Sequence, residues 1–389
     1  MTKPKNIHLK IALVCDWYFP RVGGIESHLR ELGKKLCENG HQVHVITPIP
    51  DIPSIRDTIP TPCDAKARDF RVIRISTPLF PYFHFMISKN GITKLENILK
   101  SEKYDLVHCH FSYVSPFAFG GLYLVKKLRL PGIITFHSFL GKFTWALKML
   151  DNWLGWSKWP VTFSAVSHGV AQDVKKSGVK RTIEVLSNGI NPQDWTVSPR
   201  EHAPHHIQIV SVMRLSKRKR PSHLIKIMDR IRGRINKDTS FKLIIIGDGF
   251  EYNKLSRMIK KRGLKNNITL MGVQTTEKIK LIFSKSDIFV LPTILESFGI
   301  AALEARCAGL PVVAMEHGGV KSFIRHGKEG FLAKNDHEMA DHIIRLINGH
   351  DLLTTISKNN INTPCAITWE QVIPEHERLY KKSRDILQP

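Results

Sequence analysis

The chain has 389 residues, 42% of them hydrophobic, and its 58 Lys and Arg against 34 Asp and Glu give a formal net charge of +24. This length predicts about two domains, and the lack of an apolar run of about 18 residues argues against a membrane-spanning helix. The six scattered cysteines form no C-x-x-C pair, which argues against a disulfide framework or a zinc site.

The excess of positive charge predicts a polyanionic partner, which could be nucleic acid, an anionic membrane surface or a phosphorylated substrate. The basic N-terminal stretch MTKPKNIHLK leads directly into a strand-like segment and does not resemble a signal sequence. We therefore expect a cytoplasmic protein, or one bound peripherally at the cytoplasmic face of a membrane.

Strand-like and helix-like segments alternate along the whole chain. In the first half, strands are expected at 9–15, 42–47, 71–76, 105–109, 132–136, 161–166 and 182–187. In the second half they are expected at 207–213, 241–247, 267–272, 287–292, 311–315 and 331–333. This βα alternation predicts an α/β fold with two doubly wound, Rossmann-like domains, each with a parallel sheet covered on both faces.

The polar segment 191–205 contains prolines and is expected to link the two domains. We place the N-terminal domain at 1–195 and the C-terminal domain at 196–365. A final helix within 366–389 is a candidate to pack back on the N-terminal domain, and Pro374 should kink or split it.

Ligands of open parallel sheets bind beyond the carboxyl ends of the strands, so the strand-to-helix junctions are candidate sites. Gly23 and Gly24 follow the first strand and would let the backbone approach a phosphate or a sugar closely. The G-x-G-x-x-G spacing is absent, so a dinucleotide site is not supported, and a simple glycine turn is the structural alternative.

Three histidines, His108, His110 and His137, lie at expected strand ends. A strand-end imidazole can bind a sugar hydroxyl or act as an acid or base near neutral pH. The H-x-H pair would also suit a metal, but no nearby carboxylate or thiol cluster completes a ligand set, so we expect no metal. A hydrogen-bonded structural role is the alternative.

Basic residues follow the first strand of the second half, with Arg214 at the strand end and Lys219 in the loop before a helix opened by Pro221. An Arg and a Lys at a strand end suit a diphosphate, because Arg offers a planar fork and Lys a point charge. The alternative is a solvated basic surface.

Two carboxylates, Glu296 and Glu304, bracket the run ESFGIAALE after the strand at 287–292. Ser297 could cap a helix whose free amides attract phosphate, with one carboxylate on the loop and the other on the helix. A carboxylate beside such amides makes sense if it binds hydroxyls, and hydroxyls next to phosphates describe a nucleotide sugar. Ordinary helix-start acids are the alternative.

Four tryptophans lie within 142–159, interspersed with lysines: Trp145, Trp153, Trp156 and Trp159. Aromatic residues beside lysines suit a membrane interface or a lipid acceptor, and a domain-packing patch is the alternative. These tryptophans are distant in sequence from the basic residues at 214–237, which argues against a shared nucleic-acid groove.

Taken together, the motifs resemble the retaining nucleotide-sugar glycosyltransferases of family 4. The matching segments are DWYFPRVGGIESHLRELGKKLCENGHQVHVIT, DLVHCHF, TFHS, AVSHGV, LSNGI, MRLSKRKRP, GDG, PTILESFGIAALEARCAGLPVVA, HGGV and HGKEGFLA. The first-domain segments are also similar to the GlcNAc transferase that acts on phosphatidylinositol and to lipid mannosyltransferases. The resemblance implies a GT-B fold, with two Rossmann-like domains facing each other across a cleft.

The resemblance also implies roles for individual residues. Arg214 and Lys219 would bind the donor diphosphate, and Glu304 the ribose. Gly23 and Gly24 would face the donor phosphate and the acceptor, and His137 would touch the donor sugar. The transferred sugar and the phosphates would meet Glu296 and the backbone of Ser297, Phe298, Gly299 and Ile300. On this basis His137, Glu296, Arg214 and Lys219 form the catalytic set, and neither a metal nor a cofactor is expected.

The chain departs from the family pattern at three places, none of which removes a catalytic role, and Lys321 is the one that could alter the donor pocket. Arg220 stands where Gly is common after the lysine, Val320-Lys321-Ser322 stand where Pro-Glu is common, and Ser187 stands where Pro is usual. We expect transfer from a UDP-sugar such as UDP-GlcNAc, with GDP-mannose next, to a hydroxyl of a lipid or lipid-linked glycan. A nucleotide-sugar epimerase, a glycan phosphorylase and a non-enzymatic polyanion binder are the alternatives.

Overall fold

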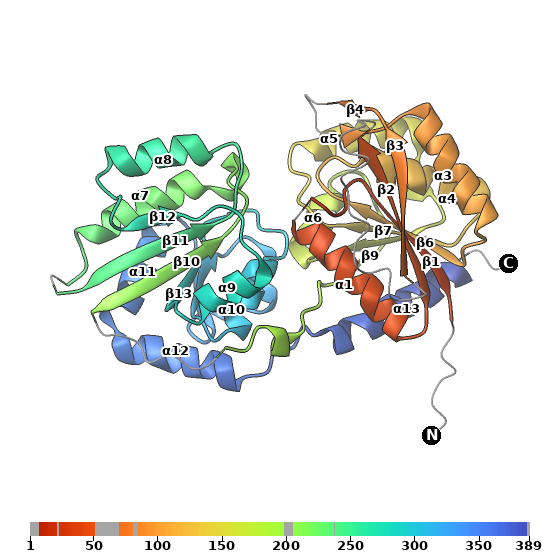
Figure 1. The fold of residues 1–389 in the computed structure, drawn as a ribbon. Coiled ribbons are helices and arrows are strands. Elements are labelled where there is room, and N and C mark those ends of the chain that lie inside the picture. Colours follow the sequence, from red (N-terminus) through yellow and green to blue (C-terminus); the bar gives the residue numbers. More distant parts are fainter. Residues whose placement is uncertain are drawn as a thin grey trace, which may run out of the picture. The chain divides into compact units, whose positions relative to one another are not determined.

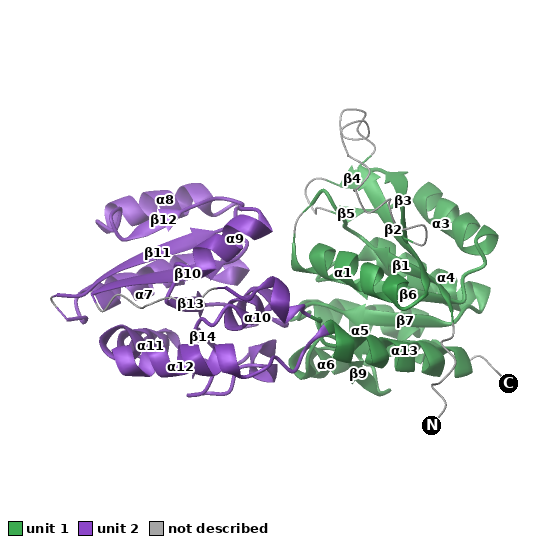
Figure 2. Ribbon diagram, turned by 60° about the horizontal axis from the view of Figure 1, so that its bottom comes forward, with its two compact units in different colours: residues 1–189, 369–389 green, residues 190–368 purple. Residues whose placement is uncertain are grey.

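The computed structural model describes residues 8–21, 23–50, 70–80, 85–197, 205–236 and 238–386. The chain forms two compact units, one of residues 1–189 with 369–389 and the other of residues 190–368 (Figure 2). The observed boundaries, after residues 189 and 368, lie a few residues from the boundaries expected at 195 and 365. Residues 198–204 of the expected linker lie outside the described residues.

Unit 1 contains a parallel sheet of seven strands in the order β3-β2-β1-β6-β7-β8-β9 (Figure 1). The strands are β1 (Lys10–Cys15), β2 (Gln42–Pro50), β3 (Phe70–Thr77), β6 (Leu106–Phe111), β7 (Gly132–Phe136), β8 (Thr162–Ala165) and β9 (Ile183–Val185). Its helices are α1 (Gly24–Glu38), α3 (Lys89–Ser101), α4 (Pro116–Leu128), α5 (Phe143–Leu154), α6 (His168–Lys175) and α13 (Trp369–Asp385). The short strands β4 (Leu79–Phe80) and β5 (Phe85–Met86) pair antiparallel.

Unit 2 contains a parallel sheet of six strands in the order β12-β11-β10-β13-β14-β15. The strands are β10 (His206–Val212), β11 (Ser240–Ile246), β12 (Ile268–Leu270), β13 (Ile288–Leu291), β14 (Val312–Met315) and β15 (Gly330–Ala333). The helices are α7 (Pro221–Arg232), α8 (Tyr252–Lys261), α9 (Thr276–Phe283), α10 (Ile300–Cys307), α11 (Asp336–Asn348) and α12 (His350–Asn362). Two doubly wound parallel domains are thus confirmed.

Each sheet has a central strand that is buried on both faces. All six residues of β6 and all four of β13 are buried, as expected of parallel strands covered by helices on each side. The strand order reverses between β1 and β6 in unit 1 and between β10 and β13 in unit 2. Such reversals open a crevice at the carboxyl ends of the two strands, which is where open α/β sheets bind ligands.

Helix α13 belongs to unit 1 although it follows unit 2 in the chain. Ser383 Oγ donates to the carbonyl of Gly132 on β7 at 2.8 Å. At the start of the helix, the Trp369 ring packs so closely on Gly189 that a Cβ there would lie 2.5 Å from Trp369 Cδ2. The helix continues through Pro374, so the proline does not split it.

Five buried histidines gather where α1, β6, β7 and α13 meet: His28, His108, His110, His137 and His376. The His108 and His110 rings lie 4.0 Å apart, which confirms that the H-x-H pair shares one sheet face. His108 is hydrogen-bonded to Thr135 Oγ1 at 2.6 Å and to Tyr380 Oη at 3.2 Å. Burial lowers the pKa of every member, to about 3 for His137 and about 4 for His376.

These lowered pKa values predict that unit 1 loses stability in acid. Below the unfolded value of 6.5 the unfolded chain takes up protons that the folded cluster excludes, so the free energy of unfolding should fall as the pH drops from about 6.5 toward 4. The loss by pH 5 should be on the order of 2 kcal/mol for each of His137 and His376. Urea titrations at several pH values can follow tryptophan fluorescence, since six of the seven tryptophans lie in unit 1.

His376→Gln should make this pH dependence shallower, whereas His317→Gln, at an exposed position of unit 2, should leave it unchanged. An unfolding free energy that stays constant between pH 7.5 and 5 would contradict the prediction.

Candidate functional site

The residues predicted from the second half of the chain gather at the carboxyl ends of β10 and β13. Lys219 ends the short helical turn Lys217–Lys219 after β10, and its Nζ donates to Glu296 Oε2 at 2.7 Å. Glu296 lies in the loop after β13 and is 7% exposed, whereas the Lys219 side chain is 31% exposed. A lysine ammonium has three donors, so Lys219 can bind an anion while it holds Glu296.

Arg214 directly follows Met213 at the end of β10 and is exposed. Its strand-end position agrees with the sequence expectation. Leu215, the next residue, is buried and fixes the loop: its amide donates to the Asp248 carbonyl at 2.9 Å, and its carbonyl accepts from the Glu251 amide at 3.1 Å. The loops after β10 and β11 therefore form one rigid edge.

Two glycines of the GDG segment make that contact possible. Gly247 and Gly249 have φ values of +125° and +155°, and a Cβ would lie 2.0 Å from the Met213 carbonyl oxygen at the first and 2.5 Å from the Leu215 carbonyl oxygen at the second. The loop after β11 thus packs backbone against backbone, which only glycine permits.

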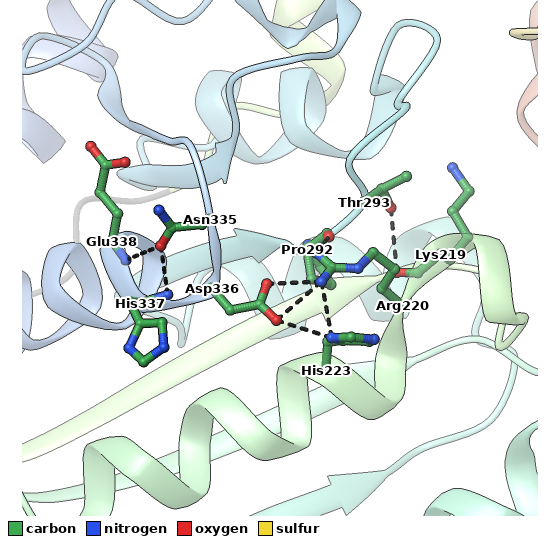
Figure 3. Close-up of polar contacts among 9 residues, drawn as sticks. All are labelled: Lys219, Arg220, His223, Pro292, Thr293, Asn335, Asp336, His337 and Glu338. Atoms are coloured by element: carbon green, nitrogen blue, oxygen red, sulfur yellow. Dashed lines mark hydrogen bonds and ion pairs between the residues drawn. The ribbon is translucent and has the colours of Figure 1, made fainter.

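Arg220, which departs from the family pattern, anchors the loop that carries Lys219 (Figure 3). Its Nη2 donates to both carboxylate oxygens of Asp336, at 2.9 and 3.0 Å, and its Nη1 donates to the Pro292 carbonyl at 3.0 Å. His223 Nδ1 lies 2.9 Å from both Arg220 Nη2 and Asp336 Oδ2. We call Arg220, His223 and Asp336 the arginine clamp.

The backbone explains why glycine is common at this position. Arg220 has φ 59° and ψ 37°, the left-handed region that costs a side-chain-bearing residue roughly 1 kcal/mol or more. The bonds of the arginine clamp offset that cost. Partial burial raises the pKa of Asp336, but the bond from His223 and the charge of Arg220 outweigh it and hold the pKa below its ordinary value.

Sequence reasoning missed His223 and Asp336. Asn335 caps α11 by accepting from the amides of His337 and Glu338 at 2.9 and 3.0 Å, which sets Asp336 in the first turn (Figure 3). An Asn-Asp pair before an apolar helix signals such a cap. The sequence carries no signal that this Asp meets an arginine 116 positions earlier.

The loop from Glu296 to Gly299 is held by a second glycine pair. The Gly319 amide donates to the Glu296 carbonyl at 2.7 Å, and a Cβ on Gly319 would lie 2.2 Å from the Ser297 carbonyl oxygen. The HGGV segment therefore supports the loop that presents Glu296. The helix expected at Ser297 begins instead at Ile300, with Gly299 as N-cap at φ +94°, so the prediction that Ser297 caps it is wrong.

This arrangement leaves the ESFG backbone as a loop beside the start of α10. Phe298 is 2% exposed and packs on Phe323, with ring centroids 5.5 Å apart. This buried contact anchors the loop. Ile300 is the first helical residue. Glu304 follows one turn later on α10, which confirms that one carboxylate lies on the loop and the other on the helix.

Burial raises the pKa of Glu304 to about 8, and the charge of Lys280 counteracts part of this shift. Glu296 and Glu304 thus occupy different environments, one paired with a lysine and the other desolvated. A carboxyl with so raised a pKa suits a partner that supplies hydrogen-bond donors rather than a second anion.

In unit 1, Gly23 is the N-cap of α1 in extended conformation and Gly24 is its first residue. The carbonyl of Gly23 accepts from the Ser27 amide at 3.0 Å, and no side chain caps the helix. His137 follows β7, and its Nε2 is hydrogen-bonded to His110 Nδ1 at 2.9 Å. His137 therefore belongs to the buried histidine cluster, and its low pKa keeps it neutral at physiological pH.

Within the described ranges, no three His, Cys, Asp or Glu side chains are grouped as a metal would require. None of the described helices combines the length and hydrophobicity needed to cross a bilayer.

Two family profiles match the chain in tandem. "Glycosyltransferase Family 4" matches residues 22–194, and "Glycosyl transferases group 1" matches residues 198–363. The first lies mainly in unit 1 and the second lies within unit 2.

Characterised relatives match over most of their length. The phosphatidylinositol N-acetylglucosaminyltransferase GPI3 subunit of Saccharomyces cerevisiae is 27% identical over 80% of this chain and 68% of its own. The N-acetyl-alpha-D-glucosaminyl L-malate synthase of Bacillus anthracis is 24% identical over 96% of both chains. The alpha-monoglucosyldiacylglycerol synthase of Acholeplasma laidlawii is 23% identical over 90% of this chain and 91% of its own.

Solved structures share the fold. Anabaena HepE in complex with UDP superposes with a TM-score of 0.74 at 18% identity, covering 96% of this chain and all of HepE. With the two parallel α/β sheets of a GT-B fold and both family profiles in tandem, the chain belongs to glycosyltransferase family 4, whose members transfer a sugar from a nucleotide-sugar donor.

Proposed function

We propose that the chain transfers N-acetylglucosamine or a related hexose from a UDP-sugar to a hydroxyl of a lipid or lipid-linked glycan, with retention of configuration and without a metal. In this reaction the bond between the anomeric carbon and the UDP oxygen breaks, the acceptor oxygen bonds to that carbon, and the hydroxyl proton is released. UDP leaves with one more negative charge than it carried in the donor, which balances the released proton.

The observation that carries the proposal is the contact of 2.7 Å between Lys219 Nζ and Glu296 Oε2 at the β10/β13 reversal. The contact joins a cation that can bind the diphosphate to a carboxylate that can accept hydrogen bonds from sugar hydroxyls. The two groups bind opposite ends of the bond that breaks, so one contact sets their separation.

The cations supply the electrophilic help. Negative charge develops on the leaving diphosphate as the bond breaks, and fixed cations at that point lower the barrier. In the proposal Lys219 and Arg214 bind the diphosphate, the backbone of residues 297–300 approaches its phosphates, and Glu304 accepts hydrogen bonds from the ribose. On unit 1, Gly23 and Gly24 approach the donor phosphate and acceptor, and neutral His137 contacts the donor sugar.

The names of the relatives support the proposed donor and acceptor. Two of the three characterised relatives are named for N-acetylglucosaminyl transfer, and HepE was solved with UDP and with UDP-glucose. Two carry phosphatidylinositol or glucosyldiacylglycerol in their names, which favours a lipid acceptor. GDP-mannose is the next donor to test, and an epimerase or phosphorylase on the same fold would differ in making no new glycoside from a nucleotide sugar and an acceptor.

Lys219→Ala should lower kcat by about 10²–10³, because one fixed cation at a developing charge contributes that much. UDP release from UDP-GlcNAc, UDP-glucose and GDP-mannose, each with and without a lipid acceptor, measures both activity and donor choice. Lys261→Ala, which removes an exposed lysine of α8, is the matched control and should retain wild-type turnover. Wild-type turnover in Lys219→Ala would refute the role of this lysine.

The arginine clamp should position Lys219 without touching the substrate. Arg220→Gly keeps the left-handed backbone and removes the clamp together with the bond to the Pro292 carbonyl, so kcat/KM for the donor should fall about tenfold through looser positioning. Asp336→Asn should cause a similar loss, and the double variant should lose little more because both changes break the same contact. Fully additive losses would show that the two residues act independently.

Activity should survive removal of divalent ions. EDTA treatment should change turnover less than about twofold, because protein cations replace the metal in the proposed mechanism. A loss above tenfold that Mg²⁺ or Mn²⁺ restores would overturn the metal-independent part of the proposal.

A further inference from the structure

The lysine-rich tryptophan segment separates into two pairs with opposite environments. Trp156 and Trp159 are 0% and 4% exposed, whereas Trp145 and Trp153 are 68% and 82% exposed. In the described part of the chain these last two are the only tryptophans classed as exposed. A domain-packing role therefore explains one pair and leaves the other without a structural reason.

The buried pair fastens α5 to unit 1. Trp156 Nε1 donates to the Leu147 carbonyl at 3.0 Å, and the Trp156 ring lies 5.9 Å from that of Phe163 on β8. Trp159 Nε1 donates to the Leu154 carbonyl at 3.3 Å. At the other end, Asp173 Oδ2 accepts from the amides of Leu140 and Gly141 at 2.7 and 3.0 Å. Helix α5 is thus held at both ends and presents a fixed outer face.

That outer face is apolar along its length. Trp145, Met149 and Trp153 are spaced four residues apart, which places them on one side of the helix, and Met149 is 54% exposed. Tyr113, 42% exposed, extends the patch, since its ring lies 5.7 Å from that of Phe143 at the start of α5. We call Trp145, Met149 and Trp153 the α5 outer face.

The exposed charged residues of segment 142–159 have one sign. Lys142, Lys148 and Lys158 are exposed beside it. The single acidic residue of α5, Asp151, is half-buried and accepts from the Ser157 amide and hydroxyl at 2.7 and 2.8 Å. An apolar stripe with indole rings, flanked by lysines and lacking an exposed carboxylate, matches the anionic interface of a phospholipid bilayer.

We propose that the α5 outer face docks on an anionic phospholipid bilayer, with Trp145, Met149 and Trp153 entering the interface and the lysines meeting the head groups. Only residues 138–142 separate α5 from His137 at the end of β7. Docking would therefore bring the carboxyl edge of the unit 1 sheet close to the lipid surface. The proposal rests on α5 alone and is independent of the donor and acceptor proposed above.

Vesicle sedimentation of the full chain tests it without any donor. Binding to vesicles of phosphatidylglycerol and phosphatidylcholine at low salt should exceed binding to phosphatidylcholine alone, and tryptophan emission should shift to the blue. Trp145→Gln with Trp153→Gln should weaken partitioning by at least about tenfold, because the inserted apolar area is lost. Each of Lys142→Gln and Lys148→Gln should weaken it roughly fivefold.

The matched controls lie in unit 2. Leu281→Gln, at an exposed apolar position of α9, and Lys261→Gln with Lys265→Gln, at exposed basic positions, should change binding less than twofold. UDP release with a water-soluble acceptor should be the same in the tryptophan variant and the wild type, which separates docking from catalysis.

Absence of binding to anionic vesicles at low salt would overturn the proposal. Equal loss in the unit 2 lysine variant would show diffuse attraction by the net charge and would overturn it as well. A dimer seen by light scattering that the tryptophan variant abolishes, together with no vesicle binding, would assign the face to a second copy of the chain instead.

Discussion

The site depends on a constraint of parallel sheets, which place the carboxyl ends of all strands along one edge. In unit 2 the strand order reverses between β10 and β13, so the loops that follow these two strands diverge to opposite faces and leave the strand ends uncovered. Lys219 and Glu296 come from these two loops and meet at 2.7 Å. They lie 77 positions apart in sequence, and the sheet topology alone brings them together.

Arg220 shows how a single substitution can be absorbed by its surroundings. A glycine would adopt the left-handed backbone of this position freely, whereas an arginine adopts it at a cost. The side chain then binds Asp336 and the Pro292 carbonyl, which ties the loop after β10 to the start of α11 and to the end of β13. Arginine at this position thus strains the backbone, and in return its side chain cross-links the loop that carries Lys219.

Much of the fold and part of the site were predictable from the sequence, because both depend on local patterns of residue type and spacing. Apolar strand runs and the βα alternation predicted two doubly wound sheets, and the strand ends pointed to Arg214, Lys219 and Glu296. The arginine clamp was not predictable. An Asp in the first turn of a helix is favoured by the helix dipole alone, so its presence does not indicate an arginine partner. The start of α10 was also predicted wrongly, because Ser297 is a good cap by residue type while Gly299 provides the backbone conformation that the turn requires.

The histidines and tryptophans were ambiguous for a related reason. His137 meets His110 from the neighbouring strand, and α13, which supplies His376 and Tyr380, follows more than 200 residues later in the chain. Of the four tryptophans within one segment, two are buried and two are exposed, and the packing of α5 against unit 1 determines which. Burial is a property of the assembled unit, so residue type and spacing could not decide between a core and a surface role.

The two glutamates of ESFGIAALE illustrate the same division within nine residues. Glu296 is buried but paired, so its charge is compensated by Lys219. Glu304 is set on the first turns of a helix and is desolvated, so its pKa rises to about 8. Similar side chains at one junction thereby lie in opposite environments, one paired with a cation and the other desolvated and suited to hydrogen-bond donors. A nucleotide sugar presents both kinds of partner within one molecule, with a charged diphosphate between two sets of hydroxyls, and the pair of environments fits that pattern better than it fits two solvated helix-start acids.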